Sequence, residues 1–228
     1  MFIKFILAAI VVVVAIAGIA YYNKTENNNE KPQLEFITEK DAKLTADERK
    51  IAEDRLTDIE KKLEEIKEGE ESEKYNLTMQ LGFQKNVLGK LAEARDAFLA
   101  AEKMQPENYT APLALFHAYL AMGDNDSALM NIKKAIDLRS ENAELWRQYI
   151  MLEKERFSAT NEKLQEIYSE ALAKTNSSVD IITVYAQFLE EKGDLNKAIE
   201  QWQKAIAAYP RGEALYQGEI TRLEGLIK

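Results

Sequence analysis

Residues 193–210 read GDLNKAIEQWQKAIAAYP, and the spacing of small residues in this stretch recurs upstream. Gly89 and Gly123 are separated by one interval of about 34 residues, and Gly193 follows Gly123 after roughly two such intervals. The same offsets relate other small residues and the prolines: Ala94, Ala128 and Ala198; Ala101, Ala135 and Ala205; Pro106 and Pro210. A single period of about 34 residues, with two extra residues in the third copy, accounts for all of these spacings and predicts an array of repeated units.

The composition predicts that these units are helical. The chain of 228 residues has nine glycines and four prolines, and it is rich in alanine, leucine, glutamate and lysine. A glycine or alanine where two antiparallel helices meet lets their axes approach closely. Each pair of helices then buries its apolar face by stacking on the next pair, so the sequence predicts an all-α solenoid.

The recurring residues resemble the pattern of the tetratricopeptide repeat (TPR) family, whose helix-turn-helix unit has about 34 residues. The residues that match the family pattern are Leu81, Gly82, Ala94, Phe98, Ala101, Pro106, Leu115, Tyr119, Ala128, Ile132, Ala135, Trp146, Tyr149, Tyr168, Ala171, Tyr185, Ala186, Leu189, Ala198, Trp202, Ala205 and Pro210. The resemblance implies four units, at residues 75–108, 109–142, 143–178 and 179–212. Residues 213–228 resemble the extra helix that caps such a stack.

An acidic amphipathic helix is expected before the repeats, within residues 44–74. Its apolar residues recur at helical spacing from Ala52 to Ile66. This stripe covers about two heptads, fewer than the three or four that define a coiled coil. Two interpretations therefore stay open: residues 52–66 join two copies into a homo-oligomer, or the helix docks on the neighbouring repeat.

The N-terminus is expected to be a transmembrane anchor in residues 1–22. Residues 5–22 are 18 uncharged residues, and a helix of that length is about 27 Å long, close to the roughly 30 Å hydrocarbon core of a bilayer. Residues 23–43 are expected to be a flexible linker. We expect a single-pass protein with its N-terminus inside and the repeats on the extracytoplasmic side. Cleavage as a signal peptide, which would secrete the protein, stays open because small residues are suitably spaced at Ala15 and Ala17.

Catalysis, cofactors and nucleic acid are not expected. The chain has no cysteine, a single histidine and a net charge of −9, whereas nucleic-acid surfaces need clustered lysine and arginine. It contains no phosphate-binding loop, zinc-binding helix motif or nucleophile elbow. The sequence therefore predicts a non-enzymatic protein without a cofactor or metal.

The resemblance also implies a binding surface, because the first helix of each TPR unit lines a concave groove that holds a peptide or a partner's helix. By repeat position the lining residues are Asn76, Met79, Phe83, Leu113, His117, Leu120, Arg147, Met151, Thr183 and Gln187. The N-terminal half of this set is apolar and the C-terminal half is polar. The sequence predicts a membrane-tethered scaffold or adaptor that binds a protein partner and aids assembly of an envelope complex. A self-associating structural scaffold or filament subunit is the alternative.

Overall fold

The computed structural model describes residues 44–227, which form ten α-helices and one short 3₁₀ helix and contain no strand. The helices are α2 (Ala46–Glu65), α3 (Glu71–Val87), α4 (Leu91–Met104), α5 (Thr110–Met122), α6 (Asn125–Leu138), α7 (Ala143–Glu155), α8 (Asn161–Lys174), α9 (Val179–Glu191), α10 (Leu195–Ala208), η1 (Pro210–Gly212) and α11 (Glu213–Ile227). The expected anchor (1–22) and linker (23–43) lie outside the described residues. Between residues 44 and 227, no helix combines the length and hydrophobicity that crossing a bilayer requires.

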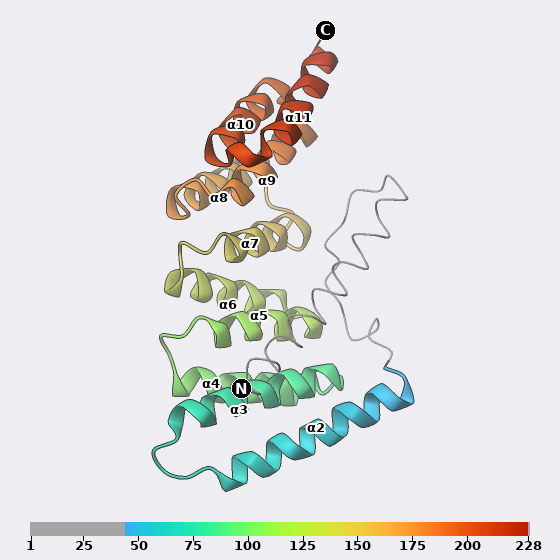
Figure 1. The fold of residues 1–228 in the computed structure, drawn as a ribbon, viewed down its shortest axis with the longest axis vertical. Helices are drawn as coiled ribbons and strands as arrows, with labels where there is room; N and C mark the ends of the chain where they lie inside the picture. Colours follow the sequence, from blue (N-terminus) through green and yellow to red (C-terminus); the bar gives the residue numbers. More distant parts are fainter. Residues whose placement is uncertain (1–43, 228) are drawn as a thin grey trace. The chain divides into compact units, whose positions relative to one another are not determined.

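Successive helices pack in pairs, as the repeat period predicts, and residues 44–227 form an all-α helical-repeat solenoid (Figure 1). The pairs are α3/α4, α5/α6, α7/α8 and α9/α10. Contacts also join corresponding helices of neighbouring pairs. The Tyr75 hydroxyl of α3 lies 2.6 Å from Thr110 Oγ1 of α5, and Lys134 of α6 forms a 3.0 Å ion pair with Glu102 of α4. In these units the first helices thus neighbour one another, and so do the second helices.

The recurring glycines lie at the turns between paired helices, where the backbone is left-handed. Gly123 and Gly193 have φ values of 78° and 79°, a left-handed conformation that glycine adopts without steric cost. The two aspartates that follow them differ. The Asp124 carboxylate accepts a hydrogen bond from the backbone N–H of Ser127, which caps α6. Asp194 makes no such cap and instead lies 3.4 Å from the Lys197 ammonium, so the same dipeptide caps only one of the two helices.

The small residues of the repeat lie where the helices meet. Ala94, Ala101 and Ala198 are fully buried. Gly82 of α3 faces the ring of Phe98 on α4, and a Cβ built on Gly82 would stand 2.3 to 2.8 Å from three atoms of that ring. Atoms cannot approach so closely, so glycine at this position allows α4 to pack directly against α3.

The third pair is less tightly joined than the others, and the turn between its helices contains no glycine. Five residues separate α7 from α8, and Ser158 among them has a positive φ of 50°. Helices α7 and α8 approach each other less extensively than α3 and α4 do. Aromatic contacts stabilise this region instead: the rings of Tyr168 and Tyr185 stack with centroids 4.7 Å apart across α8 and α9.

Helix α2 docks on α3 of the same chain. Ala52 and Leu56 are buried with Leu88 in one apolar cluster, and the Gln84 side-chain amide donates a 3.0 Å hydrogen bond to the Ala52 carbonyl. This contact uses the apolar stripe that could have formed a coiled coil, so the structure does not support an oligomer through residues 52–66. The helix ends at Glu65, and residues 71–74, which the sequence analysis grouped with it in the segment 44–74, belong to α3.

Helix α11 covers the end of the last pair. Its Tyr216, Ile220 and Leu223 are buried, and the Tyr216 ring stacks on Trp202 of α10 with centroids 5.8 Å apart. Ile227, which the sequence pattern puts on the same face, is exposed, because it lies at the last turn of the helix. The other side of α11 faces outward.

Candidate protein-binding surface

Helix α5 differs from its neighbours in having no charged residue. It reads TAPLALFHAYLAM, without aspartate, glutamate, lysine or arginine, whereas each of the other nine described α-helices carries several charges. Leu113 is half-buried, and His117 and Met122 are exposed. A partner that covers this helix would not have to strip water from a charged group, which is the costly part of burying a polar surface.

Helix α3, whose Tyr75 contacts Thr110 of α5, also exposes apolar side chains. Phe83 is 49% exposed and Val87, one turn later, is 46% exposed. The Phe83 ring packs edge-on against Phe98, with centroids 5.1 Å apart and an interplanar angle of 63°. Because the ring is held on its inner side, its outer side is presented in a fixed orientation. We call Phe83, Val87, Leu113 and His117 the α3/α5 surface.

The structure places the ten predicted groove residues in different environments. Those that are exposed are Asn76, Phe83, His117 and Gln187, and those that are half-buried are Leu113, Arg147, Met151 and Thr183. Met79 and Leu120 are buried. Met79 belongs to the core cluster that contains Phe98 and Leu115. These two side chains therefore do not line an accessible surface, and a binding role for the other eight stays a prediction.

Helices α7, α9 and α11 expose polar side chains, and ion pairs join these helices to one another. Lys154 of α7 lies 2.6 Å from Glu191 of α9. Arg222 of α11 lies 2.7 Å from Glu190 of α9, and its hydrogen bonds with Glu190 and Glu219 raise the pKa of its guanidinium. Ion pairs near the surface contribute little to stability. They do pair these charged side chains of α7, α9 and α11 with one another in the same chain. The helix without charged residues is α5, and the exposed apolar side chains Phe83 and Val87 are on α3.

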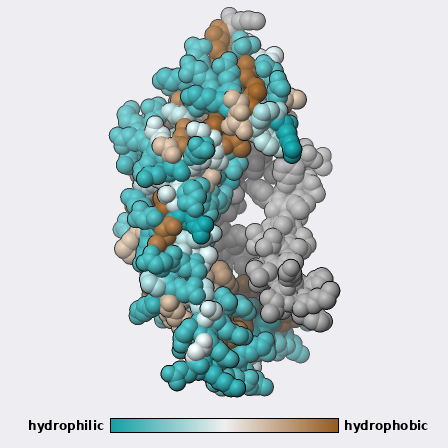
Figure 2. All heavy atoms as spheres, turned by 60° about the vertical axis from the view of Figure 1, so that its left-hand side comes forward, coloured by the Kyte–Doolittle hydropathy of each residue, from teal (hydrophilic) through white to brown (hydrophobic). Residues whose placement is uncertain are grey.

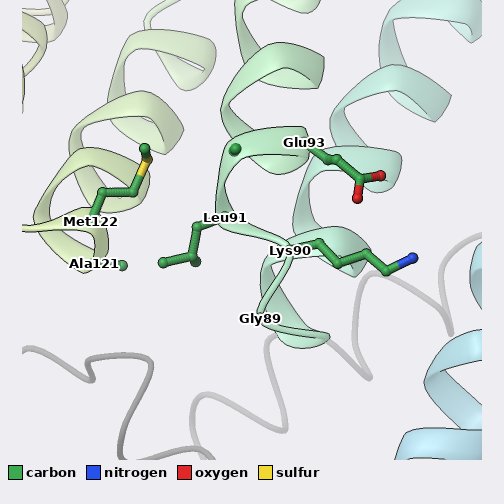
Figure 3. Close-up of a pocket in the computed structure, with 7 residues that line it drawn as sticks. Gly89, Lys90, Leu91, Glu93, Ala121 and Met122 are labelled. Carbon is green, nitrogen blue, oxygen red and sulfur yellow. The ribbon is translucent and has the colours of Figure 1, made fainter.

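An open depression of about 460 Å³ lies beside the α3/α5 surface, lined by Gly89, Lys90, Leu91, Ala92, Glu93, Ala121 and Met122 (Figure 3). In Figure 3 Leu91 and Met122 lie at one side of it, whereas Lys90 and Glu93 extend the other way. None of the ten predicted residues lines it. The prediction missed it because it considered only the first helix of each unit, whereas this depression lies between the α3–α4 turn and the end of α5.

The described part of the chain offers no metal site. Among residues 44–227, no three histidine, aspartate or glutamate side chains come together in a way that could hold a metal ion. The single histidine, His117, lies beside Phe116 with ring centroids 4.8 Å apart.

Comparisons with known proteins agree with this fold. A family model described as "Tetratricopeptide repeat" matches residues 117–142. A double mutant of MamA RS-1 is 16% identical over 73% of this chain and 89% of that chain, with a TM-score of 0.52. TTC0263, a TPR protein of Thermus thermophilus, is 20% identical over 75% of this chain and 91% of that chain (TM-score 0.47). PilF of Pseudomonas aeruginosa is 18% identical over 67% of this chain and 68% of that chain (TM-score 0.49).

The matched segment shows one tetratricopeptide-type repeat at residues 117–142, and the similarity to MamA RS-1 shows a helical-repeat fold. Proteins of this type generally act as scaffolds for interactions between proteins, and no catalytic family is indicated. The matched residues run from α5 into α6 and so include part of the helix that carries no charge.

Proposed function

We propose that this protein is a membrane-tethered TPR scaffold that captures an apolar segment of a protein partner on the α3/α5 surface and so aids assembly of an envelope complex. The observation that carries the proposal is the uncharged helix α5 next to the exposed apolar side chains of α3. In a chain in which 30% of residues are charged, an uncharged and partly exposed helix is where an apolar partner loses the least solvation.

The exposed side chains suit modest affinity. Full burial of a side chain such as phenylalanine or valine stabilises by about 1.5–3 kcal/mol. Phe83 and Val87 are about half exposed, so covering them contributes roughly 1 kcal/mol each. A tether compensates for weak binding, because it raises the effective concentration of a partner in the same membrane to the millimolar range.

The tether and the location rest on the N-terminal sequence. The 18 uncharged residues at 5–22 are long enough to span a bilayer, and we place the helical repeats on the extracytoplasmic side. Protease treatment of intact cells that carry a C-terminal tag tests this placement: the tag is expected to be digested without lysis. A protected tag would reverse the orientation, and a tag found in the medium would show that the segment is cleaved.

A photo-crosslinking amino acid at Val87 tests the binding surface in cells that make the full chain. We expect a discrete adduct with one partner protein, because Val87 is exposed beside Phe83. The substitution Phe83→Glu, which adds a charge to the surface, should abolish that adduct. Met130→Glu is the matched control, since Met130 is 64% exposed on α6, and it should leave the adduct unchanged. Equal loss with both variants, or no loss with either, would refute the proposed surface.

A further inference from the structure

Helix α11 exposes large apolar side chains on the side that does not pack against α10. Leu215 is 68% exposed and Leu226 is 62% exposed, near the two ends of this 15-residue helix. Figure 2 shows hydrophobic groups at the C-terminal end of the described chain, surrounded by hydrophilic atoms. Leucines exposed to this degree at both ends of one helix are outside the core, because the buried side chains of α11 are Tyr216, Ile220 and Leu223.

The two exposed leucines and the two charged residues between them form a pattern that complements itself. Leu215, Glu219, Arg222 and Leu226 follow one another at spacings of four, three and four residues, so they form a single stripe along the helix. Read backwards, the stripe is leucine, arginine, glutamate and leucine. A two-fold axis that passes between positions 220 and 221 therefore brings Leu215 opposite Leu226 of the second copy and Glu219 opposite Arg222 of the second copy. This reciprocal pairing is what an isologous contact requires.

The charged centre of the stripe is already ordered. The Arg222 guanidinium donates hydrogen bonds of 2.7 and 2.9 Å to Glu219 Oε2 and one of 2.7 Å to Glu190 Oε2. Two such centres facing each other in antiparallel order alternate negative and positive charges. Because the arginine is held in place, little side-chain entropy is lost when the second copy binds.

The space beside the stripe is open. A Cβ built on Gly218 or Gly225 would meet no atom within 4 Å, and both glycines lie on the outward side of α11, next to the stripe. Helices with small residues at the contact can approach closely. Because Gly218 and Gly225 have no side chain, α11 does not block a second helix from reaching its leucines. The glycines support the contact, but the leucines and the opposite charges define it.

We propose that α11 pairs in antiparallel orientation with α11 of a second copy and forms a two-fold homodimer. Fifteen residues make a helix about 22 Å long. A single pair of this length buries less than the roughly 1,200 Å² that marks stable interfaces, so the dimer is a weak one. The contact uses α11, whereas the proposed partner site uses α3 and α5, so either can fail without the other.

Thiol crosslinking of the full chain in detergent tests the geometry, because the natural chain has no cysteine. When Leu215→Cys protein is mixed with Leu226→Cys protein, mild oxidation is expected to give a disulfide-linked dimer. Each variant alone should give little, since eleven residues along a helix separate like positions by about 16 Å. Met130→Cys, at an exposed position on α6, measures random collision. A mixed yield no higher than that of Met130→Cys, or self-crosslinking of Leu215→Cys that matches the mixture, would overturn the proposal.

Charge reversal provides a second test that does not depend on disulfide geometry. Glu219→Lys makes the stripe wholly positive and Arg222→Glu makes it wholly negative, so each variant alone should sediment as a monomer at concentrations where the natural chain dimerises. An equimolar mixture should restore the dimer. Circular dichroism of both variants is the control, and it should show that they keep their helices. If the natural chain is monomeric at millimolar concentration, or if folded single variants dimerise as it does, the contact is refuted.

Discussion

Replacing Gly82 with alanine should destabilise the protein, although alanine is normally the better helix former. The added Cβ would stand 2.3 Å from Cε1, 2.6 Å from Cδ1 and 2.8 Å from Cζ of the Phe98 ring. Phe98 is 2% exposed in the core cluster, so the ring has no free space to enter. Overpacking of this kind costs about 1–3 kcal/mol. This cost equals or exceeds the roughly 1 kcal/mol by which alanine stabilises a helix relative to glycine.

Urea unfolding followed by circular dichroism measures this effect, and we expect a lower midpoint for Gly82→Ala than for the natural chain. Gly218→Ala is the matched control. It also lies within a helix, but its Cβ would meet nothing within 4 Å, so its midpoint should be unchanged or higher. If Gly82→Ala proves as stable as Gly218→Ala, then the close contact of α3 with α4 does not depend on the missing side chain.

Two further predictions concern the helix ends and the docked helix. Asp124→Ala should lower the melting temperature more than Asp194→Ala, because only Asp124 caps its helix. The hydrogen bonds from Ser127 lower the pKa of the Asp124 carboxyl below its ordinary value of 3.8. Its contribution is therefore present above that value and is lost as the pH falls through the lowered pKa, so the difference between Asp124→Ala and the natural chain should shrink in acid. Leu56→Glu puts a charge into the α2/α3 cluster, and limited proteolysis should then cut within α2 before the repeats are digested.

The repeated helix pairs could be predicted from the sequence because their cause is local and periodic. A small residue such as Gly82 is needed wherever two helices cross closely, and this need recurs with every unit. The turn at Gly123 could be predicted for a similar reason, since few other residues adopt a positive φ at low cost. Asp194 shows the limit of the pattern: whether an aspartate caps its helix depends on side-chain geometry and on a nearby lysine, which the spacing does not encode.

The candidate binding surface could be predicted only in part. Repeat position correctly gives Phe83 and His117 as exposed. It does not predict whether a residue one helical turn away on the same helix is exposed or buried. Met79 precedes Phe83 by one helical turn and is nevertheless buried with Phe98 in the core cluster. Met122 is exposed at the end of α5, and the depression beside it depends on where the α3–α4 turn passes, a long-range feature.

Hydrogen–deuterium exchange of the full chain with and without its crosslinked partner tests the central claim most directly. The account predicts slower exchange of amides in residues 76–87 and 110–122, where α3 and α5 bear the exposed apolar side chains, with α6 and α8 unchanged. Protection confined to α7, α9 and α11, or spread over the even-numbered helices with α3 and α5 unaffected, would contradict it.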